Sequence, residues 1–176
     1  MTTVAWDQKV LAVDSLITRT RGEDVDILHV NSCEKMFLMD DGCVFTWCGP
    51  VEDGWKFMEW YNTNHKNGTE QPYPKVEGNF TGLLLRLDGT LAEYWDSARY
   101  GIVKEKMAFG AVTGSLVAIG AMMAGAGAID AVRIAMKRCP YTGGEMVMAG
   151  KIDEKNKQGS ISKKENKTLS QRIYHT

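Results

Sequence analysis

Thr2 is the residue whose chemistry the rest of the chain could serve, because it directly follows the initiator methionine. A side chain this small allows an aminopeptidase to remove Met1, which would leave a free α-amine on the same residue as a hydroxyl. An α-amine titrates near ~7.7–8.0, so such a residue carries its general base beside its nucleophile. Many proteins also begin Met-Thr-Thr without any such chemistry, so the reading depends on what the chain places around Thr2.

The first element that could position Thr2 is a tight β-hairpin. Two short apolar runs, residues 4–6 and 10–13, flank the polar pair at 7–8, which is the spacing of two strands joined by a short turn. The second run ends in Asp14, so the hairpin returns a carboxylate to the start of the chain. By itself, the hairpin fits any β-rich fold.

Apolar runs between Asp-Gly turns and Pro or Gly breaks predict the remaining elements. Strands are expected at 27–30, 35–39, 43–48, 80–87, 90–95, 104–109 and 144–151, helices at 51–65, 114–124 and 128–137, and loops at 16–26 and 64–78. The helix at 51–65 is expected to turn Trp55, Met58 and Trp60 or Tyr61 towards the core.

Segregation of strands from helices indicates an α+β protein and not the alternation of a parallel sheet. Two antiparallel sheets face to face, each covered outside by helices, would bury every apolar face. We therefore expect a four-layer α-β-β-α sandwich. Residues 1–150 are expected to form this one domain. Residues 151–176, with seven Lys/Arg against three Asp/Glu, are expected to be a basic tail that is mobile or ordered by a partner.

Composition excludes several classes of function. A net charge of −1, with no basic cluster interleaved with aromatics, gives no case for a nucleic-acid binder. Four cysteines without a CxxC pattern indicate reduced, buried thiols in a cytoplasmic protein, and the N-terminus lacks a signal peptide. Residues 107–129 carry no charge and could span a bilayer by length. Small residues dominate this stretch and glycines interrupt it, so we expect two helices packed on a sheet and no membrane span.

Four further segments after Thr2 and Asp14 contain residues that could take part in the same chemistry. Lys35 lies in Glu-Lys-Met-Phe, and Cys48-Gly49-Pro50 separates a strand from a helix. Val112-Thr113-Gly114-Ser115 opens a helix rich in small residues, and Cys139-Pro-Tyr-Thr-Gly-Gly144 precedes the strand expected at 144–151. In this order, residues 2–150 resemble the proteasome β-subunit and HslV peptidase family of N-terminal nucleophile hydrolases, and in particular its short phage-encoded members.

The resemblance implies a role for each matching residue. Thr2 is the nucleophile, Asp14 orients the site, and Lys35 lowers the pKa of the amine and hydroxyl by its positive charge. Gly49 contributes an oxyanion-hole amide, and Trp47 falls at the wall of the substrate pocket. Lys35 could equally be a solvated lysine at the start of a strand, and Trp47 an ordinary core tryptophan.

The same resemblance assigns supporting hydroxyls to Thr113 and Thr142. One departure concerns the amine network, because Cys139 stands where the family has an aspartate. A buried cysteine carries no charge at neutral pH unless its pKa is lowered. This departure leaves two functions open: a weakened enzyme, or an inactive member of the fold that serves as an interaction or assembly module.

The function expected from the resemblance is amide hydrolysis of a peptide or protein by an N-terminal threonine, with no metal or organic cofactor. It also implies a homo-oligomeric ring in the cytoplasm, that of the host cell for a phage protein, with an ATPase partner left unidentified.

Overall fold

The computed structural model describes residues 2–21, 24–28, 34–67, 72–76, 80–95, 100–110, 112–151 and 174–175. Over these residues the chain is α+β, with two five-stranded antiparallel sheets, a separate two-stranded ribbon and three helices. The α+β class expected from the sequence is therefore confirmed.

The first sheet is built around the N-terminal hairpin. Its strand order is β10 (Met107–Gly110), β1 (Thr3–Trp6), β2 (Val10–Asp14), β11 (Met146–Gly150) and β12 (Tyr174–His175). The predicted hairpin is confirmed, with Val4 opposite Val13. At its turn, the Asp7 carboxylate accepts hydrogen bonds from the Lys9 and Val10 N–H groups, which fixes the register at the tip.

The second sheet holds both hairpins predicted from Asp-Gly turns. Its order is β5 (Met36–Leu38), β6 (Val44–Cys48), β7 (Thr81–Leu85), β8 (Leu91–Tyr94) and β9 (Tyr100–Ile102). Gly42 and Gly89 in the two turns both have φ of +86°, a conformation that glycine adopts without strain. The edge strand β9 was not predicted.

One predicted loop is wrong. Residues 16–26 were expected to be irregular, yet the chain forms β3 (Ile17–Arg21) paired with β4 (Asp24–Leu28). The register sets Arg19 opposite Asp26 and Arg21 opposite Asp24. The strand predicted at 27–30 accordingly begins earlier, at Asp24, and its last two positions lie outside the described residues.

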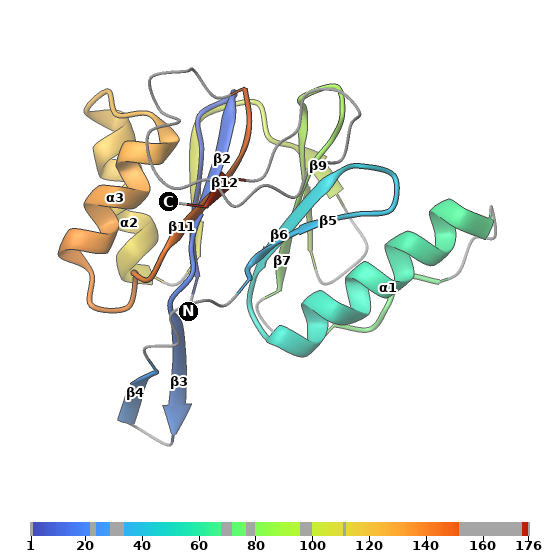
Figure 1. Ribbon diagram of the computed structural model, residues 1–176, viewed down its shortest axis with the longest axis horizontal. Helices are drawn as coiled ribbons and strands as arrows, with labels where there is room; N and C mark the ends of the chain where they lie inside the picture. Colours follow the sequence, from blue (N-terminus) through green and yellow to red (C-terminus); the bar gives the residue numbers. More distant parts are fainter. Residues whose placement is uncertain are drawn as a thin grey trace.

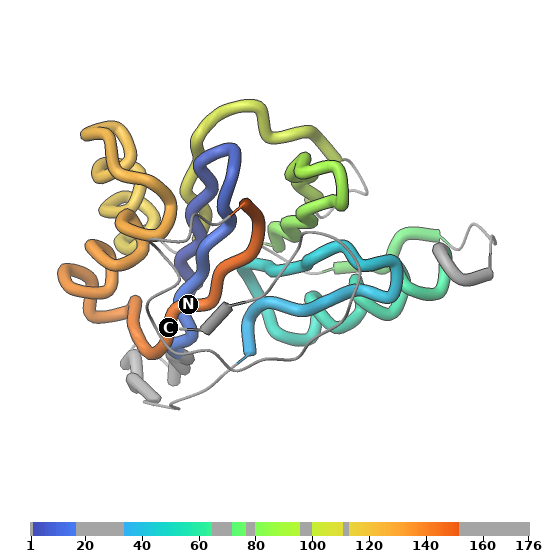
Figure 2. The backbone as a smooth tube through the Cα atoms, turned by 45° about the horizontal axis from the view of Figure 1, so that its top comes forward, coloured from blue at the N-terminus to red at the C-terminus, as the bar shows by residue number. Residues whose placement is uncertain are grey.

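Three apolar clusters define the layers. One lies between the sheets, a second joins the first sheet to α2 (Val112–Met123) and α3 (Ala128–Arg138), and a third joins the second sheet to α1 (Val51–Asn67). Figure 1 shows α2 and α3 on one side of the paired sheets and α1 on the other, and the tube in Figure 2 keeps the same order. This arrangement is compatible with the predicted sandwich.

The inward face of α1 differs from the prediction. Phe57 is fully buried and Tyr61 nearly so, whereas Trp55, expected in the core, is half exposed. Phe57 and Tyr61 are four residues apart and so share one face of the helix, with Trp55 turned away from it. Met58 and Trp60 lie at the edge of the buried cluster.

The charge-free stretch at 107–129 divides as predicted into a strand and two helices. β10 pairs with β1, α2 ends at Met123 and α3 begins at Ala128. Within the described part of the chain, no helix has both the length and the apolar content to cross a bilayer.

Candidate active site

Asp14 is the centre of a buried polar network beside the start of the chain. It closes β2, and no part of its side chain is exposed. Oδ1 accepts a hydrogen bond from the Thr3 N–H at 2.8 Å, and Oδ2 accepts one from the Gly143 N–H at 3.2 Å. A buried carboxylate needs such donors, because an unpartnered buried charge is strongly destabilising. Asp14 therefore ties the first residues to the loop before β11.

Lys35 completes the charge balance of Asp14. Its Nζ lies 3.1 Å from Asp14 Oδ1 and donates to the Leu16 carbonyl oxygen at 2.6 Å. The lysine side chain is only 10 % exposed, so the pair is shielded from water and from screening by salt. The alternative of a solvated lysine at a strand start does not hold in this structure. The structure therefore brings Lys35 and Asp14 together next to Thr3.

The Thr142 hydroxyl is also part of this network. Thr142 is buried, and its Oγ1 lies 2.8 Å from Thr3 Oγ1. Gly114, in the first turn of α2, packs directly against the pair: a Cβ there would lie 2.1 Å from Thr3 Oγ1 and 2.3 Å from Thr142 Oγ1. Only a glycine lets the helix approach this closely, so Gly114 is part of the site's construction.

Cys139 and Thr113 form the next contact outward. Cys139 directly follows the last residue of α3 and is buried, whereas Thr113, in the first turn of α2, is exposed. Thr113 Oγ1 lies 3.1 Å from Cys139 Sγ. Burial raises the pKa of the Cys139 thiol, but hydrogen bonds from Thr113, Thr142 and the Tyr141 N–H outweigh it, so that its pKa lies below the usual range. These donors favour a negative charge on the sulfur.

Thr2 itself is half-buried and precedes the first residue of β1. Its carbonyl lies so close to Gly110 that a Cβ on that glycine would overlap it. Gly110 pairs with Thr3 across the sheet and has φ of +126°. The residue that carries the expected nucleophile is thus held by its neighbour Thr3 and by a glycine of β10.

Gly49 follows β6 directly and has φ of +124°, which only glycine adopts readily. The residue before it, Cys48, belongs to the core between the sheets. Burial raises the pKa of the Cys48 thiol to about 12, with the charges of Lys35 and Asp14 acting on it in opposite directions. The end of β6 therefore lies within electrostatic reach of the Lys35–Asp14 pair.

Trp47 is packed beneath α1. A Cβ on Gly54 would meet its indole at 2.0 Å, and the ring stacks on Phe37 and Phe45 at centroid distances of 5.4 and 5.6 Å. Its Nε1 donates to the Pro50 carbonyl oxygen at 3.1 Å. These contacts describe a core tryptophan. Trp55, six residues after Gly49, is half exposed and makes edge contacts with both Trp47 and Phe37.

Sequence reasoning left three participants without a role: Thr3, Gly114 and Ser15. Thr3 links Asp14 to Thr142 through its N–H and its hydroxyl. Ser15 Oγ accepts the Glu145 N–H at 2.7 Å and so fixes the loop between α3 and β11. A glycine in the first turn of a helix beside polar residues was the available signal for Gly114, since it weakens a helix unless close packing needs it.

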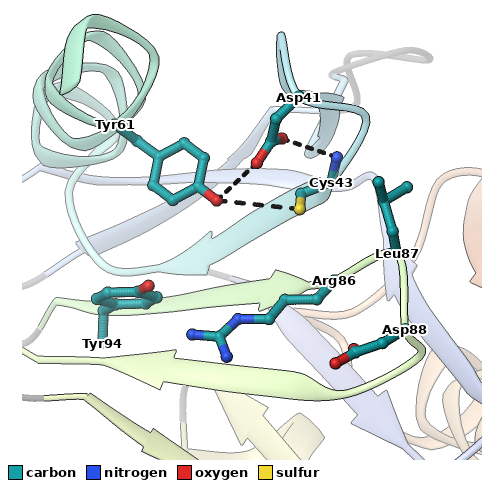
Figure 3. Close-up of a pocket in the computed structure, with 7 residues that line it drawn as sticks. All are labelled: Asp41, Cys43, Tyr61, Arg86, Leu87, Asp88 and Tyr94. Atoms are coloured by element: carbon teal, nitrogen blue, oxygen red, sulfur yellow. Dashed lines mark hydrogen bonds between the residues drawn. The ribbon is translucent and has the colours of Figure 1, made fainter. Parts of the chain in front are cut away.

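A separate hollow of about 390 Å³ lies at the other end of β6. Figure 3 shows its lining, in which Asp41 accepts hydrogen bonds from the Tyr61 hydroxyl at 2.8 Å and the Cys43 N–H at 2.9 Å. These bonds join the β5–β6 turn to α1, so Asp41, Tyr61 and Cys43 have a structural role here. No group of three or more potential metal-ligating side chains occurs among the residues that the structure describes.

No protein-family model matches this chain, and no curated protein matches it either.

Proposed function

We propose that this chain is an N-terminal threonine peptidase with the fold of the N-terminal nucleophile hydrolases. The observation that carries the proposal is the buried Lys35–Asp14 pair, joined through the Thr3 N–H to the residue after the expected nucleophile. An ion pair hidden from water is costly to build. Its position beside the chain start is the position at which a free amine would need a fixed positive neighbour.

In the proposed mechanism, removal of Met1 frees the Thr2 amine. The hydroxyl of Thr2 attacks a peptide carbonyl while the amine takes its proton, directly or through a water. Lys35 disfavours protonation of the amine by repulsion, and Asp14 holds Lys35 in place. The Gly49 amide stabilises the oxyanion, and water then hydrolyses the acyl-enzyme.

The alternation of side chains along β1 supports this geometry. Val4 and Trp6 face the core between the sheets, whereas Ala5 packs towards the helices and Thr3 bonds to Thr142. Continued by one residue, the alternation puts Thr2 on the face of Val4, towards the second sheet and Gly49. Trp55, which is half exposed beside the same end of β6, is the aromatic side chain that a substrate bound there could contact, so the proposed substrate carries an apolar or aromatic side chain before the cleaved bond.

The second candidate is a non-catalytic module that keeps the fold for assembly. The observation that favours it is Cys139, which replaces the carboxylate of the resembling family with a thiol. Ring assembly, a cytoplasmic location and an ATPase partner are implied by the same resemblance and belong to the same proposal.

Intact-mass measurement and one variant separate these candidates. For the enzyme, we expect protein from its native source to lack one methionine and to cleave a quenched fluorescent peptide library. Thr2→Ala should abolish cleavage with a change in melting temperature of only a few degrees, because a residue at the chain end contributes little packing. Retained Met1, or cleavage that persists in the variant, would contradict a threonine mechanism.

A further inference from the structure

The hollow drawn in Figure 3 lies where the two Asp-Gly turns of the second sheet meet α1. Because β6 pairs with β7, these turns lie side by side, and a Cβ on Gly42 would meet the Leu87 side chain at 3.3 Å. The length of β6, roughly 20 Å of extended chain, separates Cys43 in the lining from Gly49 at the candidate active site. A volume of about 390 Å³ is within the range of small-molecule sites.

Two carboxylates line the hollow on the side of the turns, Asp41 from one turn and Asp88 from the other. Asp41 is fixed by the Tyr61 hydroxyl and the Cys43 N–H. Asp88 Oδ1 accepts hydrogen bonds from the Thr90 N–H at 2.8 Å and from the Thr90 hydroxyl at 2.7 Å, and these bonds lower the pKa of Asp88. Both carboxylates are therefore held in place before any ligand binds, which reduces the entropic cost of binding.

The opposite charge comes from Arg86, the residue after β7. Its guanidinium lies 5.5 Å from the centroid of the Tyr100 ring and hydrogen-bonds to the side chains of Tyr94 and Tyr100. These two rings are stacked, with centroids 5.4 Å apart. Figure 3 shows the guanidinium turned toward Tyr94 and away from Asp88. The hollow therefore presents a positive group on the side of Tyr94 and negative groups on the side of the turns.

The rest of the lining is neutral and largely apolar. Burial raises the pKa of the Cys43 thiol to about 11, and burial together with the bond to Asp41 raises the pKa of Tyr61, so both stay protonated at neutral pH. Leu87 and the rings of Tyr61 and Tyr94 supply apolar surface. A complementary ligand carries one anionic group, one cationic group and an apolar portion. An α-amino acid with an apolar side chain has all three in a small volume.

We propose that this hollow binds a free α-amino acid with an apolar side chain. The ligand carboxylate accepts hydrogen bonds from the Arg86 guanidinium, whose planar geometry matches a carboxylate. The ligand ammonium group donates to the carboxylates of Asp88 and Asp41, and the side chain packs on Leu87. Each charge of the ligand thus meets a fixed group of opposite sign, which offsets its removal from water. This site is separate from the candidate active site and does not depend on peptidase activity.

Isothermal titration calorimetry of the full chain tests this pairing of charges without any variant. L-Leucine supplies both charged groups, N-acetyl-L-leucine lacks the ammonium charge, and L-leucinamide lacks the carboxylate. We expect leucine to bind at least about tenfold more tightly than either analogue, because each analogue loses a hydrogen-bonded charge. No binding of leucine at millimolar concentration, or equal binding of the three compounds, would overturn the proposal.

Two substitutions then assign each charge to its residue. Arg86→Met should weaken leucine binding by about tenfold or more and leave the binding of leucinamide unchanged, because leucinamide has no carboxylate to lose. Asp88→Asn retains the turn, since Asn-Gly forms the same turns as Asp-Gly, and should weaken leucine but not N-acetyl-leucine.

The matched controls are Arg133→Met and Asp130→Asn, which alter an exposed ion pair on α3 and should leave leucine binding unchanged. If Arg86→Met weakens leucinamide as much as leucine, or if the controls lose leucine binding, the assignment is refuted. If either variant in the hollow fails to fold, the comparison of the three compounds on the wild type still decides the proposal.

Discussion

Replacement of Lys35 by Met is the sharpest perturbation of the buried network, because it keeps the side-chain stem and removes only the charge. At 3.1 Å the attraction between Lys35 and Asp14 is about 5 kcal/mol for an effective dielectric constant near 20. Much of this attraction is offset by the cost of removing both charges from water. The loss of stability expected for Lys35→Met is therefore the free-energy cost of leaving Asp14 charged and buried with one partner fewer.

The structure sets the size of that penalty. Loss of one partner of a buried pair costs about 3–5 kcal/mol. Asp14 would keep the Thr3 and Gly143 N–H groups, so we expect the lower end, about 3 kcal/mol. For a chain of this length, that corresponds to a fall in melting temperature of about 6–12 °C. Asp14→Asn combined with Lys35→Met removes both charges, so the double variant should be less destabilised than the sum of the singles by about 2 kcal/mol.

Urea unfolding followed by tryptophan fluorescence measures these differences, with an unchanged m value confirming that only stability has moved. Arg133→Met is the matched control, because it breaks an exposed pair with Asp130 and should cost about 0.5 kcal/mol or less. The reasoning fails if Lys35→Met is no more destabilising than the control, or if the effects of Lys35→Met and Asp14→Asn are additive.

Three further predictions concern other contacts. Asp7→Ala should lower the free energy of unfolding by about 2 kcal/mol in urea, because this carboxylate also accepts the Ala128 N–H at the start of α3. Gly114→Ala should reduce peptide cleavage at least tenfold through the clash described above, whereas Gly120→Ala, where a Cβ meets open space, should leave cleavage unchanged and stabilise the fold by up to about 1 kcal/mol. Burial raises the pKa of the Cys48 thiol, so above pH ~9 this thiol ionises in the unfolded chain but stays protonated in the folded one. Cys48 should therefore lower the wild-type free energy of unfolding by up to about 1.4 kcal/mol for each pH unit above that value. Cys48→Ala should flatten this slope in urea titrations from pH ~8 to ~11.

Local signals were enough to predict most elements of the fold. The Asp-Gly turns at Gly42 and Gly89 fixed two hairpins, and the glycines before Ala128 divided the apolar stretch into α2 and α3. These features depend on neighbouring residues, so a sequence shows them directly.

Features that depend on distant partners were missed. Trp55 is as apolar as a core residue, and only the position of the second sheet turns Phe57 inward instead. β12 exists as a strand through its pairing with β11, and the intervening residues 152–173 lie outside the described chain. Nothing near Tyr174 in sequence indicates that partner.

The candidate site divides in the same way. Asp14 and Lys35 were expected at the site from the family resemblance, and the structure joins them in an ion pair. The part of Thr3 could not be predicted, because it depends on Thr142, which is 139 residues away in sequence. Gly114 has its role only because that pair lies against α2.

The way the network holds Thr3 bears on whether the site is catalytic. Thr3 is held by three contacts: its N–H donates to Asp14, its hydroxyl hydrogen-bonds to Thr142, and its backbone pairs with Gly110. Because Thr2 is joined directly to Thr3, these contacts also restrict the position of Thr2. Such restraint removes the rotational freedom that a reacting group would otherwise lose in the transition state. A module used only for assembly gains nothing from it, and apolar residues in place of the buried Lys35–Asp14 pair would often be as stable or more so. A buried ion pair beside the chain end whose amine could become a base is therefore the feature that leads us to propose the enzyme before the module.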